Sequence, residues 1–97
     1  MYTSEQVIQM LNPQSIKFLL VQVDHAVRNR VLSRADKQDI QIVVEDMFYE
    51  GMEQAVERFN ALETHPREVM TSILLAYHRL PGGRVFGYLP RNLRGTI

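Results

Sequence analysis

The chain has 97 residues, and its 11 basic and 11 acidic side chains give a formal charge of zero. Hydrophobic residues make up 45% and charged residues 23%, which is typical of a globular domain and excludes a mainly disordered chain, a collagen-like chain and a histone-like polycation. The sequence contains no cysteine, so disulfides, thiolate zinc sites and thiol nucleophiles are excluded. The opening residues lack the pattern of a secretory signal, and the longest apolar run, residues 18–21, is far shorter than the roughly 20 residues of a bilayer span. We therefore expect a cytoplasmic protein without a membrane partner.

The first third of the chain has the pattern of two helices. Thr3 and Gln6 predict a capping box that starts a short helix. Asn12 and Pro13 predict the start of a second helix, which extends to about Leu32. The apolar positions of both segments recur mainly at spacings of three and four, as on one face of a helix: Val7, Ile8, Leu11, Ile16, Leu19, Leu20, Val23, Ala26, Val27 and Val31.

The middle of the chain predicts one long helix. Ser33 and Asp36 mark its start, and a helical apolar period continues from there to residue 62. Gly51 lies within this period and costs about 1 kcal/mol relative to alanine, so it marks either a bend or the close approach of another backbone. The apolar positions are Ile40, Val43, Val44, Met47, Phe48, Met52, Ala55, Val56, Phe59 and Leu62.

The length of this predicted helix bears on assembly. A straight helix over residues 34–61 would be about 42 Å long, whereas a compact domain of this size has a diameter of about 34 Å. Two interpretations remain open. Either the helix bends near Gly51, or a second copy of the chain covers its end in a helical homodimer.

A last helix is predicted over residues 66–79, with Thr64 or His65 as its cap and residues 81–83 as its stop. After residue 83, apolar and aromatic residues alternate with a strand period, which predicts an extended arm. We therefore expect an all-α fold, a small bundle of three main helices and a short N-terminal helix over residues 1–83. An extended basic and aromatic C-terminal arm over residues 84–97 would follow it.

The acidic side chains are concentrated in the middle of the chain. Residues 36–63 contain eight acids and two bases, and the helical spacing places four of these acids in one stripe: Asp46, Glu50, Glu53 and Glu57. Like charges at such spacings destabilise an isolated helix. The stripe is interpreted either as a docking strip for a basic partner or as a solvated face that the chain's own arginines neutralise.

The arm contains basic and aromatic residues and no acid: Arg84, Phe86, Tyr88, Arg91 and Arg94. Arginine contacts phosphates and aromatic rings stack on bases, so this composition permits nucleic-acid binding. The arginines are few beside the roughly six to ten phosphate contacts of a committed DNA-binding protein. We therefore favour the interpretation that the arm lies on the acidic stripe of its own or of a neighbouring subunit.

No residue pattern of an enzyme is present in the sequence. The three histidines form no metal-binding pair, and the neighbouring acids Asp46 and Glu50 lack the further oxygen ligands of a hard cation. The sequence has no nucleophile elbow and no phosphate-binding glycine loop. We therefore expect a protein without catalytic residues, metal or cofactor.

These observations predict a small non-enzymatic binding protein, an adaptor or inhibitor that masks or bridges a macromolecular partner, of the kind encoded by phages or mobile elements. A protein partner is favoured over nucleic acid. The alternative is a helix-turn-helix-like DNA-binding regulator, with a turn at residues 63–66 and a recognition helix after it. That helix would present polar groups to DNA, although the acidic helix before it would repel the phosphate backbone. Its candidate contacts are Arg67, Thr71, Ser72, His78 and Arg79.

Overall fold

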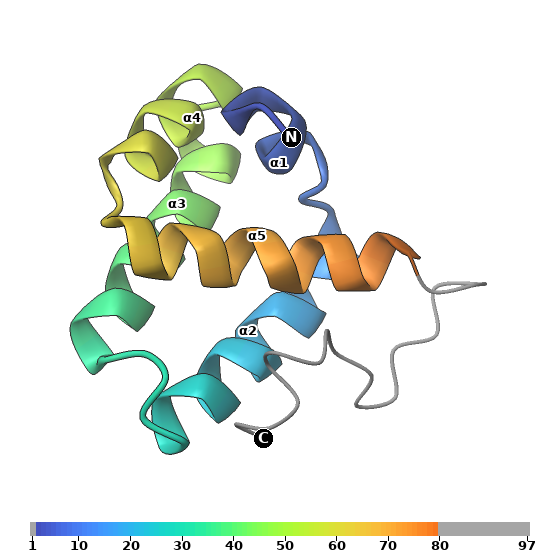
Figure 1. Cartoon of the computed structure of the whole chain (residues 1–97). Coiled ribbons are helices and arrows are strands. Elements are labelled where there is room, and N and C mark those ends of the chain that lie inside the picture. The colour runs from blue at the N-terminus through green and yellow to red at the C-terminus, as the bar shows by residue number, and fades with distance from the viewer. Residues whose placement is uncertain (1, 80–97) are drawn as a thin grey trace.

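The computed structural model describes residues 2–79, and this part of the chain folds as an all-α bundle (Figure 1). Its helices, in chain order, are α1 (Ser4–Gln9), α2 (Pro13–Arg28), α3 (Arg34–Tyr49), α4 (Met52–Ala61) and α5 (Thr64–Arg79). The predicted all-α fold is confirmed. The predicted end of the helical domain at residue 83 and the arm over residues 84–97 lie outside the described residues.

The three helix starts that the sequence marks most clearly have the predicted caps. Each is a capping box, in which the side chain before the helix and the side chain three residues later bind each other's backbone N–H. At α3, for example, the Asp36 N–H donates to Ser33 Oγ over 3.0 Å and the Ser33 N–H donates to Asp36 Oδ2 over 3.1 Å. These starts are set by residues within one turn, so local sequence was sufficient to locate them.

The predicted long helix is broken, and this corrects the sequence-based interpretation. Residues 34–61 form two helices that meet at Gly51, whose φ of 104° interrupts the helical backbone. The Asp46 carbonyl closes the end of α3 by accepting the N–H groups of both Glu50 and Gly51 over 2.8 Å. α3 has 16 residues and α4 has 10, so they are about 24 and 15 Å long. Both fit within the 33 Å extent of the molecule, and the length argument for a homodimer is therefore lost.

α2 ends four residues earlier than predicted, at Arg28. The Val31 N–H donates to the Ala26 carbonyl and the Arg30 N–H donates to the Val27 carbonyl, which together form a Schellman motif. Arg30 occupies the left-handed position of this motif, with φ at 63°. The turn directs Val31 and Leu32 back onto the core. These two apolar residues therefore pack against the core from a loop and do not extend α2.

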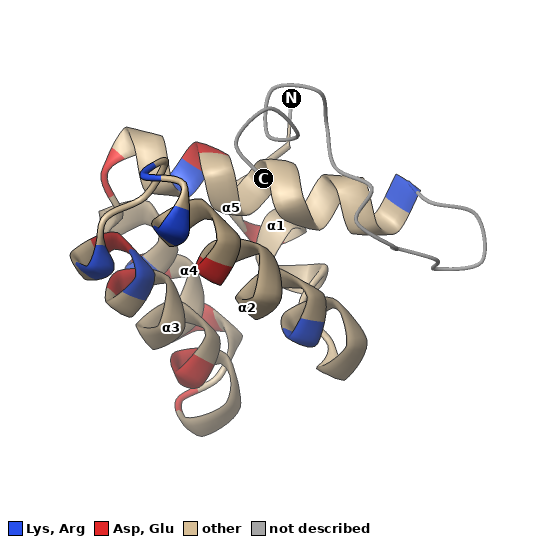
Figure 2. Ribbon diagram, turned by 90° about the horizontal axis from the view of Figure 1, so that it is seen from below, with Lys and Arg blue, Asp and Glu red and all other residues tan. Residues whose placement is uncertain are grey.

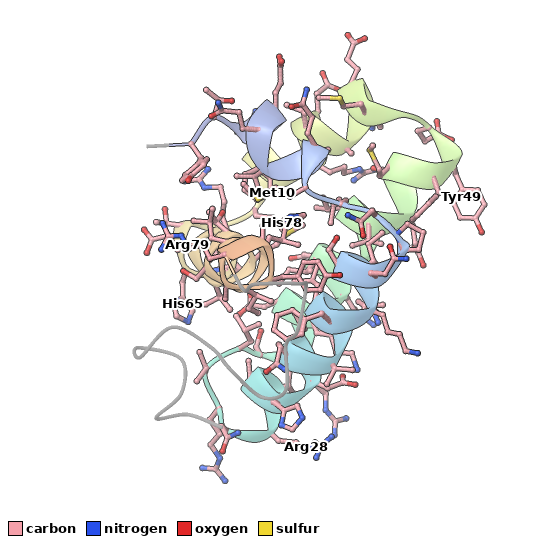
Figure 3. The ribbon with its side chains drawn as sticks, turned by 90° about the vertical axis from the view of Figure 1, so that its right-hand side faces the viewer. Met10, Arg28, Tyr49, His65, His78 and Arg79 are labelled. Carbon is pink, nitrogen blue, oxygen red and sulfur yellow. The ribbon has the colours of Figure 1, made fainter. Side chains whose placement is uncertain are left out.

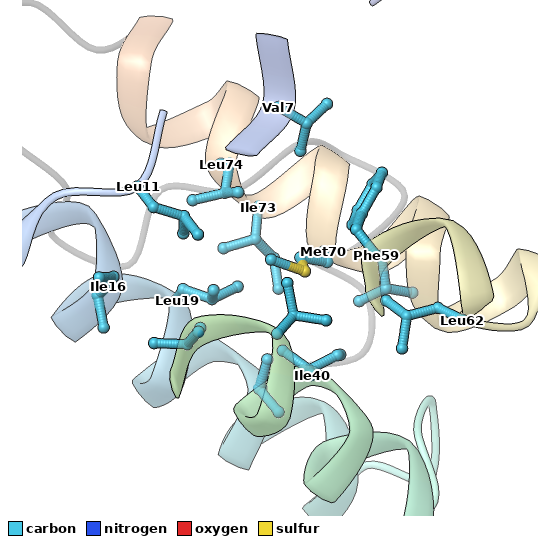
Figure 4. Packing of buried hydrophobic residues seen from close by; sticks show 14 of the residues in the cluster. Val7, Leu11, Ile16, Leu19, Ile40, Phe59, Leu62, Met70, Ile73 and Leu74 are labelled. Carbon is cyan, nitrogen blue, oxygen red and sulfur yellow. The ribbon is translucent and has the colours of Figure 1, made fainter. Parts of the chain in front are cut away.

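α5 crosses α2 and α3 and supplies the centre of the core (Figures 1 and 4). Leu19, Ile40, Met70, Ile73 and Leu74 are each at most 1% exposed. Burying an aliphatic side chain of this size contributes about 1.5–3 kcal/mol, so this layer is the main source of stability. The apolar periods described above had located Leu19 and Ile40 among these residues.

Two histidines connect the ends of α5 to loops that are distant in sequence. The His65 Nε2 lies 2.6 Å from the Val31 carbonyl, and the His78 Nε2 lies 2.9 Å from the Met10 carbonyl. A carbonyl only accepts, so each Nε2 carries the proton and donates it. The Met10 carbonyl also accepts from the buried Ser15 Oγ over 2.7 Å. The C-terminal end of α5 is therefore held beside the connection between α1 and α2.

Candidate functional site

Two large aromatic side chains are exposed at the end of α3. Phe48 is 61% exposed and Tyr49 is 82% exposed, and the Tyr49 side chain points away from the body of the molecule (Figure 3). We call this pair the aromatic corner. The sequence-based assignment of Phe48 to the core face is wrong, because α3 ends at Tyr49 and its last turn projects past the core. Tyr49 was missed, and the glycine two residues later was the signal that could have identified it.

The backbone that presents the aromatic corner is held by two contacts. The first is the double hydrogen bond at the Asp46 carbonyl, and the second joins the Asp46 side chain to α4, where Arg58 Nε donates to Asp46 Oδ2 over 2.9 Å. The Asp46 side chain is only 15% exposed. Aromatic side chains on a rigid corner lose little conformational entropy when they bind, which favours them as interface anchors.

The structure does not bring the four predicted stripe acids together. Asp46 is paired with Arg58, which bears out for this residue the expectation that the chain's own arginines neutralise the acids. Glu50 caps α3 at the corner, whereas Glu53 and Glu57 lie one turn apart on α4. The break at Gly51 changes the helix direction, so one continuous stripe no longer exists.

Glu53 and Glu57 belong instead to a groove between α1 and α4. The groove has a volume of about 500 Å³ and is lined by Met52, Val56 and three carboxylates, of which the third is Glu5 on α1. We call it the acidic groove. A hydrogen bond from Ser4 Oγ to Asn60 Oδ1 holds α1 against α4. Glu5 was not identified from the sequence, because no local signal places residue 5 beside residues 53 and 57.

Basic residues collect at the opposite end of α3, near the connection from α2 (Figure 2). Arg28, Arg34 and Lys37 line a polar groove there together with Asp24. Lys37 Nζ lies 2.5 Å from Asp24 Oδ1, and this hydrogen bond holds the pKa of the Asp24 carboxyl below its ordinary value. α3 therefore has a basic surface at its start and the acidic and aromatic residues at its end.

Several polar groups proposed for DNA contact in the helix-turn-helix alternative already have partners in the fold. Thr71 Oγ1 donates to the Arg67 carbonyl over 2.8 Å, and the His78 ring donates to the Met10 carbonyl. Arg67 Nη1 lies 3.4 Å from the Asn60 carbonyl. The exposed charged residues on α5 are Glu68 and Arg79. These contacts leave fewer side-chain donors and acceptors on α5 that could bind a base edge.

The predicted arm contacts Arg84, Phe86, Tyr88, Arg91 and Arg94 lie outside the described residues. Between residues 2 and 79, no three carboxylates or imidazoles are arranged to ligate one metal ion. No helix in that range has the length and apolarity to cross a membrane. Comparison of the chain with protein-family models, with curated protein sequences and with solved structures finds no match.

Proposed function

We propose that this chain is a small non-enzymatic binding protein, an adaptor or inhibitor, and that its aromatic corner inserts into an apolar pocket on a partner protein. The observation that supports this most is the exposure of two adjacent aromatic side chains on a braced turn. Exposed aromatic anchors dominate many protein interfaces, and the fold gains little stability from two rings that are mostly in solvent.

Charge indicates the kind of partner. Glu45 lies one turn before the aromatic corner, and Glu50 and Glu53 follow it, each with an exposed side chain. A partner pocket rimmed with lysine or arginine would complement these carboxylates, which speeds association and selects against acidic surfaces. The proposed partner is therefore a protein with an apolar pocket and a basic rim.

The test compares two variants of the full chain. Phe48→Ser with Tyr49→Ser removes both aromatic anchors, whereas Val21→Ser removes an exposed apolar side chain on α2, which is 47% exposed, and serves as the matched control. Each chain is immobilised, and proteins retained from a lysate of the native host are quantified by mass spectrometry. The retained protein is then purified and titrated against each chain by calorimetry.

Loss of each aromatic anchor is expected to cost about 2 kcal/mol or more, so the double variant loses binding by well over tenfold while Val21→Ser retains it. Circular dichroism of each variant checks that the helices are intact. Equal affinity of the wild type and the double variant would refute the proposal. Capture of only a second copy of this chain would refute it as well.

The helix-turn-helix alternative has less support, since Arg67, Thr71 and His78 already have hydrogen-bond partners and the exposed Glu68 lies on the N-terminal half of α5. A gel-mobility shift at low salt separates the two proposals. A DNA-binding regulator would shift a mixed duplex pool at micromolar protein, because sequence-independent phosphate contacts suffice there. The binding protein proposed here would leave the DNA unshifted.

A further inference from the structure

The acidic groove has the features of a site for a basic and apolar segment. Its floor is formed by Met52 and Val56, and its rim carries the carboxylates of Glu5, Glu53 and Glu57 from two helices. All three acids are exposed, and the hydrogen bond between Ser4 and Asn60 holds α1 against α4 beside them. An apolar floor between like charges favours an occupant that supplies aromatic or aliphatic side chains flanked by cations.

The chain contains one segment with this composition. Residues 84–97 hold three arginines, Phe86 and Tyr88, and no acid, and the aromatic residues lie between Arg84 and Arg91. Two aromatic rings suit the methionine and valine floor, since methionine sulfur and aromatic rings interact favourably. The three arginines equal the three carboxylates in number and are opposite to them in charge.

The described part of the chain ends at Arg79, near the end of α1. The hydrogen bond from His78 to the Met10 carbonyl holds the end of α5 beside the end of α1. α1 has six residues and is about 9 Å long, and Glu5 lies in its first turn. Residues 80–83 can span about 13 Å and the 14 residues after them about 46 Å, so the segment has ample length to reach the groove of its own chain.

We propose that the acidic groove binds residues 84–97 of the same chain, with Phe86 and Tyr88 on the Met52 and Val56 floor and the arginines on the three carboxylates. A short tether raises the effective concentration of the segment to the millimolar range, so intramolecular binding is favoured over exchange between copies. Met52 and Glu53 lie three and four residues after Tyr49 of the aromatic corner in sequence. The bound segment therefore covers the acidic side of that corner.

The absence of cysteine allows a direct test on the full chain. Asn92→Cys introduces a single thiol for a nitroxide spin label, and the label broadens the NMR signals of nearby amides. The Val56 amide is expected to lose most of its intensity, whereas the Ala35 amide at the start of α3 keeps its intensity. Raising the salt concentration to about 1 M, where the Debye length is about 3 Å, is expected to restore much of the Val56 signal.

Matched variants distinguish binding of the segment in the groove from a general effect of negative charge on the broadening. Glu5→Gln, Glu53→Gln and Glu57→Gln together remove the rim and are expected to abolish the broadening. Glu45→Gln, Glu63→Gln and Glu68→Gln remove the same charge outside the groove and are expected to leave it unchanged. Arg91→Gln with Arg94→Gln, which alters only the segment, is expected to weaken the broadening without any effect on the helices.

Three outcomes would overturn the proposal. The first is an unbroadened Val56 amide in the labelled chain. The second is equal loss of broadening in both carboxylate triples. The third is broadening in a mixture of isotope-labelled wild type with spin-labelled, isotope-free chains, since that reports exchange between copies. The experiment uses no partner protein, so its result is independent of the proposed function.

Discussion

Gly51 adopts a backbone conformation that residues with a side chain rarely adopt. Its φ is 104°, and a Cβ built on its backbone would meet no atom within 4 Å. A substitution at this position therefore costs energy through the backbone and not through a clash. The turn between α3 and α4, and with it the direction of the aromatic corner, depends on this one residue.

Gly51→Ala is expected to lower the free energy of unfolding by about 1–2 kcal/mol, because the left-handed region strains any L-residue with a Cβ. Urea unfolding followed by circular dichroism measures the change. Unaltered stability would show that the corner adopts a different backbone in solution.

Arg30 is the second strained position, at the left-handed site of the Schellman motif that ends α2. Arg30→Gly is expected to raise the unfolding free energy by about 0.5–1 kcal/mol, since relief of strain exceeds the greater chain entropy of glycine. Arg30→Ala removes the guanidinium but retains the Cβ, so it should give no gain. A gain of equal size in both variants would assign the effect to charge instead of the backbone.

Among the helices, the ion pair between Asp24 and Lys37 joins α2 to α3. The lowered pKa of Asp24 means that the folded state favours its carboxylate. The contribution of the pair to stability is therefore fully present above the unfolded pKa of about 3.9 and is lost as pH falls through the folded value. Both side chains are partly exposed, so solvent screening keeps the contribution small.

Asp24→Asn is expected to lower the unfolding free energy by about 0.2–0.5 kcal/mol at neutral pH, as for other exposed pairs. The curves of the variant and the wild type should converge only when the pH has fallen below the folded pKa of Asp24, which is lowered from its ordinary value. Urea titrations across this pH range measure the difference, with Glu63→Gln as the exposed control. A constant difference at all pH values would contradict the linkage to this carboxyl.

The connections between helices explain how far local sequence could predict the fold. The helix starts capped by Thr3, Asn12 and Ser33 depend on residues within one turn, so the sequence located them. Gly51 was recognised as a possible bend, but its φ results from closure of α4 back onto α3 and could not be derived from spacing. The end of α2 was misplaced, because the apolar residues after it pack from a loop and continue the helical period.

At the scale of the molecule, one continuous core joins all the described helices. Leu19 is fully buried at its centre, facing residues of α3 and α5 (Figure 4). Unfolding of any one helix exposes part of this core, so residues 2–79 should unfold in a single transition.

Leu19→Ala is expected to lower the unfolding free energy by about 2–5 kcal/mol, a large fraction of the roughly 5–15 kcal/mol typical of such domains. The exposed Val21→Ala on the same helix should change it by less than about 0.5 kcal/mol. Urea unfolding of the two variants measures the difference. Similar values would show that the packing around Leu19 is looser than the structure indicates.

The all-α class, three capped helix starts and most core residues could be predicted from sequence, because caps and apolar periods arise from neighbours within a turn or two. The exposure of Phe48 and Tyr49, the pairing of Asp46 with Arg58 and the groove shared by Glu5, Glu53 and Glu57 could not be predicted in this way. Each of these depends on where α4 turns at Gly51 and on which helix packs against it. Contacts between residues that are distant in sequence depend on how the whole core packs, so they cannot be predicted from a local sequence pattern.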